Sequence, residues 1–285
     1  MQVVLAPRAS TILYNLLKSR PDTRPWLLPV NVCPIVPITF LKAEIPFEFV
    51  DISPETLHMD LAKAESLVKT RKFGGLLYAH TYGEPSVPYK FFESIKDRFP
   101  ELMLIDDCCL CVPQLDADKL NPVDVQLYST GYGKIVDLNF GGYAFIRDDI
   151  NCENVSLPFA LHAYDEIEEL YKQAIHQRRR FVYQDSDWLD TTSPMPAWHD
   201  YRDQIETQRA EVLQHSSLLN AIYAERLPVE IQLPREYQDW RFNIRVKNKQ
   251  SVLDAIFSKG LFASSHYVSL AGIMGAGEEI GRAHV

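Results

Sequence analysis

The first half of the chain alternates short, almost continuous apolar runs with helix-like segments, and this alternation limits the possible folds more than any other feature. Residues 75–79 and 102–105 are apolar runs of strand length, and the amphipathic segment 89–99 lies between them. Strands that are apolar on both faces are typical of a parallel sheet covered by helices on both sides. We therefore expect an α/β fold with a mostly parallel sheet.

The alternation extends over most of the first 150 residues, and the second half differs from it. Further strands are expected at 26–32, 46–50, 125–128 and 143–146, and further helices at 10–20 and 35–42. The second half has charged helical segments at 164–183 and 201–227, a strand near 240–246 and a helix at 251–258. This pattern predicts a large domain over residues 1–185 and a smaller C-terminal α+β domain over residues 200–279.

The last six residues, Ile280 to Val285, are treated separately. The peptide Ile-Gly-Arg-Ala-His-Val is the translation of a common sequencing-adapter stretch. We expect residues 280–285 to be an artefactual tail and the native C-terminus to be missing, so this segment is left out of the fold argument.

Composition excludes several classes of protein. The chain has 285 residues and a formal charge of −9, which disfavours a broad nucleic-acid-binding face. No apolar run reaches 18 residues, so no membrane span is expected, and the start of the chain lacks a signal-peptide pattern. Three of the five cysteines stand together at 108, 109 and 111, which favours reduced thiols and a cytoplasmic location.

Polar residues at the strand ends are the candidate functional residues, because ligands of open parallel sheets bind beyond the carboxyl ends of the strands. The candidates are Ala9 and Ser10 at the start of the first helix, His80, the pair Asp106 and Asp107, and the segment from Ser129 to Lys134. Small residues at a helix start suit a phosphate group, although they are also ordinary helix caps.

Asp107 and Lys134 carry the most specific chemistry. A carboxylate at a buried strand end costs free energy unless a cation or a hydrogen-bond donor meets it, and a protonated pyridine nitrogen is one such partner. A helix-capping role remains the alternative for Asp107. Lys134 lies in a glycine-rich segment and can form a Schiff base if its surroundings favour the neutral amine. The alternative is a solvated loop lysine.

These features together match one cofactor, pyridoxal 5′-phosphate. It requires an amine for its aldehyde, a carboxylate for its ring nitrogen, and N–H and hydroxyl donors for its phosphate.

Several segments resemble the DegT/DnrJ/StrS family of sugar aminotransferases. They are residues 31–37, 49–52, 80–83, 104–107 and 128–134, the glycine pair 141–142, and His266 with Tyr267. The resemblance covers residues 8 to about 276. It implies the fold-type-I architecture, a homodimer, and transfer of an amino group, usually from glutamate, to a keto-sugar nucleotide.

The resemblance also implies roles for individual residues. Lys134 would carry the Schiff base and Asp107 would hold the pyridine nitrogen. Ser129, Ala9 and Ser10 would contact the phosphate, and His80 would lie near the cofactor. No metal ligand is implied.

The chain also departs from the family pattern. Leu110 stands where a glutamine usually touches the ring hydroxyl, Cys33 lies near the position of a stacking aromatic residue, and Arg8-Ala9-Ser10 replaces Ser-Gly-Thr. These departures predict a divergent branch. They also leave open a non-catalytic or regulatory protein on this fold, or another enzyme that uses the same cofactor.

Two further groups of residues are interpreted from their spacing and composition. Cys108, Cys109 and Cys111 are too closely spaced for two pairs of zinc ligands, and no histidine is near in sequence. We therefore expect these thiols to pack beneath the cofactor. The aromatic stretch 237–242 is expected in the small-domain core, with Trp240 and Arg241 bordering the substrate entrance.

Overall fold

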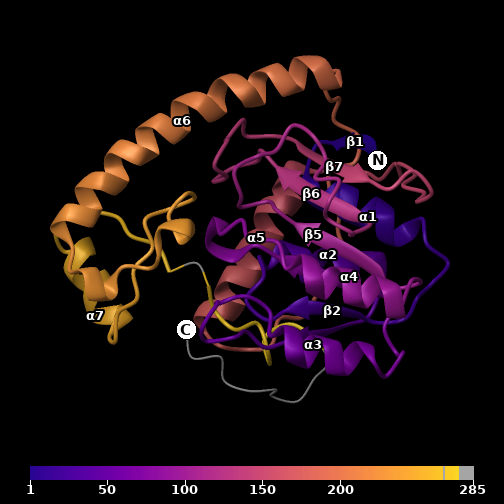
Figure 1. Ribbon diagram of the computed structural model, residues 1–285, viewed down its shortest axis with the longest axis horizontal. Coiled ribbons are helices and arrows are strands. Elements are labelled where there is room, and N and C mark those ends of the chain that lie inside the picture. Colours follow the sequence, from indigo (N-terminus) through magenta and orange to yellow (C-terminus); the bar gives the residue numbers. More distant parts are fainter. Residues whose placement is uncertain (266, 276–285) are drawn as a thin grey trace.

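A seven-stranded sheet forms the centre of the molecule (Figure 1). The computed structural model describes residues 1–265 and 267–275. The strands are β1 (Gln2–Ala6), β2 (Trp26–Pro29), β3 (Phe47–Val50), β4 (Gly75–Ala79), β5 (Met103–Asp107), β6 (Val125–Ser129) and β7 (Gly142–Ile146). Their order across the sheet is β1-β7-β6-β5-β4-β2-β3.

The sheet is mostly parallel, which confirms the predicted fold class. Strands β3, β2, β4, β5 and β6 pair in parallel, and β7 is antiparallel to both β6 and β1. All residues of β4, β5, β6 and β7 are buried, as expected of strands covered on both faces. The edge strand β1 was not predicted: its run Val3–Ala6 is apolar, but its pairing partner β7 lies far along the chain.

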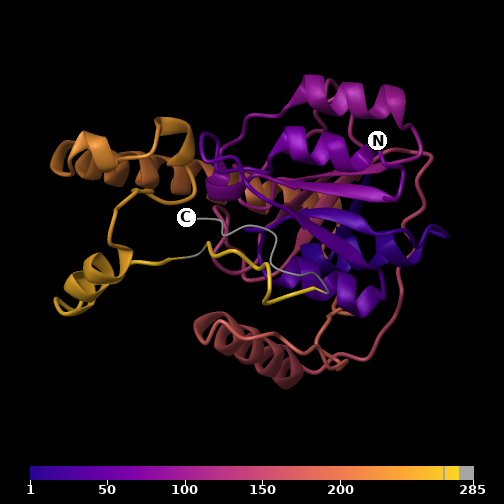
Figure 2. The ribbon, with the colours of Figure 1, turned by 90° about the horizontal axis from the view of Figure 1, so that it is seen from below.

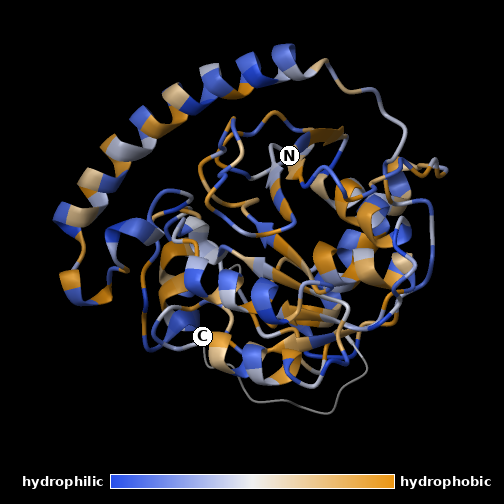
Figure 3. Ribbon diagram, turned by 45° about the vertical axis from the view of Figure 1, so that its right-hand side comes forward, coloured by the Kyte–Doolittle hydropathy of each residue, from blue (hydrophilic) through white to orange (hydrophobic). Residues whose placement is uncertain are grey.

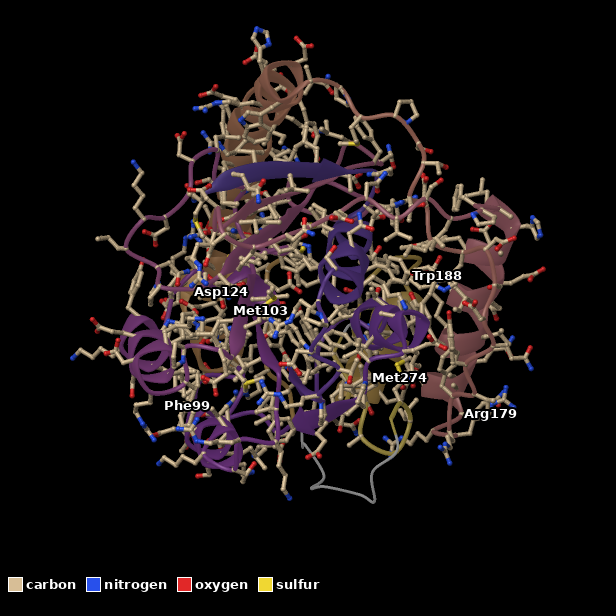
Figure 4. The ribbon with its side chains drawn as sticks, turned by 90° about the vertical axis from the view of Figure 1, so that its right-hand side faces the viewer. Phe99, Met103, Asp124, Arg179, Trp188 and Met274 are labelled. Atoms are coloured by element: carbon tan, nitrogen blue, oxygen red, sulfur yellow. The ribbon has the colours of Figure 1, made fainter. Side chains whose placement is uncertain are left out.

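Helices cover both faces of the sheet. The first-half helices are α1 (Ala9–Lys18), α2 (Ile35–Ala43), α3 (Leu61–Val68) and α4 (Tyr89–Arg98), with a 3-10 turn η1 (Thr81–Gly83). Figure 2 shows α3 and α4 on one side of the sheet and α1, α2 and α5 (Leu161–His176) on the other. In Figure 4, Phe99 lies on the α3–α4 side and Trp188 and Met274 on the other, so each face has its own apolar core.

The second half is more open than the first. Its elements are α6 (Trp198–Arg226), η2 (Val229–Ile231), η3 (Arg235–Tyr237) and α7 (Lys249–Phe257). Helix α6 leaves the body of the molecule (Figure 1), and only Tyr201 and Ile205 near its start are buried. Figure 3 shows polar and apolar residues mixed along α6, in contrast to the hydrophobic central strands. No described helix is long and apolar enough to cross a membrane.

The strand predicted near 240–246 is wrong. This segment contributes only an isolated antiparallel bridge between Gln232 and Ile244. A strand needs a neighbour to satisfy its backbone groups, and among the described residues 240–246 have only that one bridge.

The end of the described chain returns to the large sheet. Leu270 N donates to Val30 O at 2.8 Å, and Phe181 N donates to Ile273 O at 2.8 Å. Leu270, Ile273 and Met274 belong to the core beside α1 and α2, although the sequence places them in the small domain. The boundaries 1–185 and 200–279 therefore stay a prediction. His266 and the suspected tail 280–285 lie outside the described residues.

Candidate active site

Three neighbouring parallel strands bring the predicted site residues to one edge of the sheet. Ala79 of β4 pairs with Asp107 of β5, and Asp107 pairs with Leu127 of β6. Since parallel strands end at the same edge, Asp107 and Ser129 lie side by side there.

The two adjacent carboxylates, Asp106 and Asp107, point to opposite faces of the sheet, because side chains alternate along a strand. Ile105, two residues before Asp107, belongs to the core beneath α1 and α2. Leu104, two residues before Asp106, belongs to the core beneath α3 and α4. The pair that looked like one feature in the sequence therefore belongs to two different sites.

Asp107 is a buried carboxylate without a cationic partner. Its side chain is 7% exposed, and its Oδ1 accepts the Cys109 backbone N–H at 3.0 Å. The Cys109 thiol donates instead to Leu127 O at 3.9 Å. Among the described residues no basic side chain lies within 4.0 Å of it. A buried charge with a hydrogen bond but no countercharge favours binding of a cationic group from outside the chain.

Lys134 lies at the end of a tight turn after β6. Its backbone N–H donates to Gly131 O at 3.2 Å, and Gly133 N donates to Asp137 Oδ2 at 2.7 Å. Gly133 has a φ of +74°, a conformation that side chains with a Cβ rarely adopt. In the described part of the chain, Lys134 Nζ forms no ion pair and no hydrogen bond. The turn thus presents a half-buried amine with no partner.

The charges of Asp107 and Lys134 act on the same two thiols. Burial raises the pKa of Cys33, the charge of Lys134 lowers it, and that of Asp107 raises it. The pKa of Cys109 is raised by burial and by Asp107 and lowered by Lys134. Cys33 is exposed to solvent. Asp107 and Lys134 therefore share one space without pairing with each other.

A second group of residues forms an anion-binding cup beside this space. The backbone N–H groups of Ala9 and Ser10, at the start of α1, donate to no described residue, as expected at a free helix N-terminus. Ser129 Oγ accepts the N–H of Gly131 at 3.3 Å. Arg8 Nη1 lies 3.7 Å from the position that a Cβ on Gly131 would take. Helix N–H groups, a hydroxyl and a guanidinium together suit a phosphate.

The guanidinium of Arg8 packs over an aromatic ring of α5. Its guanidinium carbon lies 5.3 Å from the centroid of the Tyr164 ring on α5. It forms no ion pair with any described carboxylate, so its charge is available to an anion in the cup.

Gly142, the first residue of β7, allows the start of α1 to lie directly against this strand. A Cβ there would lie 2.4 Å from the backbone nitrogen of Ala9, closer than atoms can approach. Gly141 N donates to Pro7 O at 2.7 Å and fixes the chain just before α1. The cup therefore depends on backbone contacts that only glycine permits.

Residues of the second half close one side of the site, which supports the predicted place of Trp240 and Arg241. Trp240 Nε1 donates to Gly133 O at 2.9 Å, one residue before the lysine. Arg241 Nη2 lies 4.0 Å from the position of a Cβ on Gly133. The Nε of Arg241 is buried and has no hydrogen-bond partner among the described residues. A cationic group with an unsatisfied donor thus borders the lysine turn.

Leu110 takes no polar part in the site. It packs against the apolar cluster that contains Leu57, Tyr82 and Tyr267, together with Trp240. No side chain from this position can reach a ring hydroxyl by a hydrogen bond, as expected from the departure seen in the sequence.

The structure does not bring His80 to the other predicted residues. Its side chain is fully buried on the α3–α4 side of the sheet, with Nε2 2.8 Å from Asp106 Oδ1 and Nδ1 2.8 Å from Glu84 O. Burial lowers the pKa of His80, but Asp106 and Cys108 raise it well above its usual value. The imidazole is therefore fully engaged away from the Asp107–Lys134 space.

Two hollows lie elsewhere on the molecule. One, of about 480 Å³, is lined by residues of α7 and of the segments on either side of it, and the other, of about 610 Å³, lies beside β1 and Trp198. Neither contains a residue of the site described above.

Sequence reasoning missed two contributors to the site, Arg8 and Cys109. Arg8 was noted as a departure from a small residue, and an arginine at a helix start is itself a signal for an anion. Cys109 was expected only to fill space, and nothing in its spacing shows that its N–H holds Asp107.

No protein-family model matches this sequence, and no curated protein matches it. Solved structures do match its fold. Sugar aminotransferase CalS13 from Micromonospora echinospora is 18% identical over 90% of this chain and 72% of that one, with a TM-score of 0.60. A DegT/DnrJ/EryC1/StrS aminotransferase from Brucella abortus is 15% identical over 91% of this chain and 69% of its own, also at 0.60.

A third structure has a higher TM-score. Spr1654 from Streptococcus pneumoniae, assigned as a sugar aminotransferase and solved in its PMP form, is 15% identical over 95% of this chain and 75% of that one, with a TM-score of 0.64. At these identities the similarity concerns the fold. The resemblance that the sequence motifs indicated is confirmed at that level: this chain has the fold of sugar aminotransferases of the DegT/DnrJ/EryC1/StrS type.

Proposed function

We propose that this protein is a pyridoxal phosphate-dependent aminotransferase that acts on a keto-sugar. The observation that carries the proposal is the placement of Asp107 and Lys134. Asp107 is a buried carboxylate and Lys134 a half-buried amine. Their charges shift the pKa values of the same two thiols, Cys33 and Cys109, and neither group forms an ion pair with a described residue. A flat ring with a basic nitrogen at one end and an aldehyde near the other meets both requirements.

Described residues would hold three parts of the cofactor: the ring nitrogen, the aldehyde carbon and the phosphate. Asp107 would bind the ring nitrogen and Lys134 the aldehyde carbon. The free N–H groups of Ala9 and Ser10, the hydroxyl of Ser129 and the guanidinium of Arg8 would hold the phosphate. When bound, the cofactor supplies a cationic ring that withdraws electrons from the substrate carbon that carries the amino group.

The chain's own residues would perform the remaining chemistry. Asp107, whose Oδ1 accepts the Cys109 N–H, would hold the proton on the ring nitrogen. The Lys134 amine, once free, would take a proton from the Cα of the donor amino acid. It would deliver this proton to the cofactor carbon that carried the aldehyde. Trp240 fixes the backbone of Gly133 and so limits the movement of this base.

The substrates are proposed from the similar structures and from one side chain at the site. The similar structures are named as sugar aminotransferases, which supports a keto-sugar or nucleotide-linked keto-sugar as the acceptor. Arg241, with a buried and unsatisfied Nε beside the lysine turn, would bind an anionic group of a substrate. A glutamate donor and a homodimer follow from the family resemblance. The five free cysteines fit a cytoplasmic location.

The half-reaction with an amino donor tests the proposal. Purified protein is mixed with pyridoxal phosphate, and its visible spectrum is followed after addition of glutamate. We expect an absorbance band from cofactor bound at Lys134, and its replacement by the spectrum of pyridoxamine phosphate as 2-oxoglutarate appears.

The other outcomes separate the alternatives. A cofactor band that does not respond to glutamate or to other amino acids would favour a non-catalytic or regulatory protein, which the apolar Leu110 makes a real alternative. Release of alanine from cysteine would instead favour a different enzyme with the same cofactor. The absence of any cofactor band would contradict the proposal altogether.

A further inference from the structure

The α3–α4 side of β5 gathers four side chains that carry metal-ligating atoms. They come from the end of β4 (His80), from β5 (Asp106) and from the loop after it (Cys108 and Cys111). Ligand atoms of His80, Asp106 and Cys108 all lie within 4.8 Å of one another, and all three residues are buried. Cys111 Sγ lies 3.9 Å from Glu84 O, the same carbonyl that His80 Nδ1 contacts at 2.8 Å, which brings the fourth side chain to the same place.

The spacing of these atoms is close to that of a zinc site. Zinc binds sulfur at about 2.3 Å and nitrogen or oxygen at about 2.0–2.2 Å, so the ligand atoms of a tetrahedral site lie about 3.3–3.8 Å apart. The ligand atoms of His80, Asp106 and Cys108 lie within 4.8 Å of one another, so side-chain movements of about 1 Å bring them to these distances.

Hydrogen bonds from neighbouring groups also orient two of these side chains, His80 and Asp106. Glu84 O can only accept a hydrogen bond, so it fixes a proton on Nδ1 of His80 and directs Nε2 toward Asp106. Asn121 Nδ2 donates to the second oxygen of Asp106 at 2.6 Å and leaves Oδ1 to face His80. A carbonyl behind a histidine ligand and a donor behind a carboxylate ligand are the usual supports of metal ligands.

We propose that His80, Asp106, Cys108 and Cys111 bind one zinc ion. One imidazole, one carboxylate and two thiolates form a set that suits tetrahedral zinc, and the Cys-x-x-Cys spacing is typical of such sites. Four protein ligands leave no position for water, so the ion is structural. It fixes the end of β4 to the loop that follows Asp107 and thereby supports the reverse face of the site.

The same residues are poorly suited to other roles. Cys108 and Cys111 are both buried, so neither thiol is presented to a substrate as a nucleophile. The proposal is independent of the proposed aminotransferase activity, since it concerns the opposite face of the sheet.

Metal titration of the reduced full-length protein tests the site. Metal is first removed with a chelator in the presence of a phosphine reductant, and Co²⁺ is then added. We expect one equivalent to bind with thiolate-to-cobalt charge-transfer absorption in the near ultraviolet and the visible bands of tetrahedral cobalt. Zn²⁺ should abolish these bands and raise the Tm.

Matched variants assign the spectrum to these residues. Cys108→Ser and His80→Gln should each lose the charge-transfer bands or shift them, with affinity reduced at least about tenfold. Cys152→Ser, which removes a thiol outside the cluster, should behave like the wild type. If the wild-type protein binds no stoichiometric Co²⁺, or if its spectrum lacks thiolate absorption, the proposal is wrong. A spectrum that persists unchanged in Cys108→Ser would overturn it as well.

Discussion

Asp106 and Asp107 are neighbours in the chain, but they lie in two different environments. Asp106 is 1% exposed and bonded on both oxygens, to His80 and to Asn121. Asp107 is bonded only to Cys109 and has no cationic partner among the described residues. One carboxylate has side-chain partners within the fold on both of its oxygens, whereas the other has no countercharge among the described residues.

The difference shows how one strand can serve structure and function together. The alternation of a β-strand assigns successive side chains to opposite faces, so adjacent residues need not share a role. The closed face fixes the strand end, and the open face presents a charge at a defined position. Four experiments test this contrast, beginning with the largest expected effect.

Replacing the amine on the open face should have the largest effect. We expect Lys134→Ala to lose the absorbance band of the bound cofactor and to reduce transamination at least about 10²–10⁴-fold, because it removes both the point of attachment and the general base. Spectra and single-turnover rates with glutamate measure this. Lys119→Ala, at an exposed lysine, is the control. An unchanged band in Lys134→Ala would show that the cofactor is bound elsewhere.

Matched substitutions of the two aspartates should separate stability from activity. Asp106→Asn leaves a buried imidazole without its charged partner and should cost about 3 kcal/mol or more in the free energy of unfolding. Asp107→Asn keeps an oxygen to accept the Cys109 N–H and should cost less than about 1 kcal/mol. We expect Asp107→Asn, however, to reduce transamination at least about 10²-fold, since a neutral amide does not hold the ring proton.

Urea unfolding of metal-free protein without cofactor measures both stabilities. The contrast would be refuted if the two variants lost equal stability, or if Asp107→Asn kept full activity.

Removing the guanidinium from the anion cup should have a smaller, selective effect. We expect Arg8→Ala to weaken binding of pyridoxal phosphate about tenfold, equivalent to about 1.4 kcal/mol, and to leave the binding of pyridoxal unchanged, because Arg8 would contact only the phosphate. Absorbance titrations with the two compounds measure this, and Arg179→Ala on the surface is the control. Equal weakening toward both compounds would place Arg8 outside the cup.

The smallest effect concerns Asp22, a carboxylate that forms ion pairs with Arg20 and Arg24 in the loop before β2. Hydrogen bonds from Arg24 lower its pKa to about 2. Because the folded pKa lies below the unfolded value of 3.8, Asp22 stabilises the fold above about pH 4, and this contribution is lost as the pH falls toward 2. We expect Asp22→Asn to cost less than about 1 kcal/mol at neutral pH and almost nothing near pH 2.

Acid unfolding curves of Asp22→Asn and the wild type should therefore converge at low pH. Curves that stay parallel down to pH 2 would contradict the assignment.

Much of the fold and part of the site could be predicted from the sequence. Apolar runs such as 75–79 and 102–105 predicted the parallel strands, and the glycine-rich segment around Lys134 predicted a turn beside a ligand. These features are local: strand burial on both faces and glycine conformation depend on a few neighbouring residues. The edge strand β1 and the missing strand near 240–246 could not be predicted, because pairing depends on distant partners.

The sequence by itself determined the sheet, the carboxylate and the amine at its carboxyl edge, and the small residues at the helix start. Only the tertiary structure decided that Asp106 faces away from Asp107, that His80 joins Asp106 and Cys108, and that Arg8 reaches the cup. The reason is physical. The strand period assigns a side chain to a face, but which distant groups it meets there depends on the order in which the strands pack and the path of the loops between them.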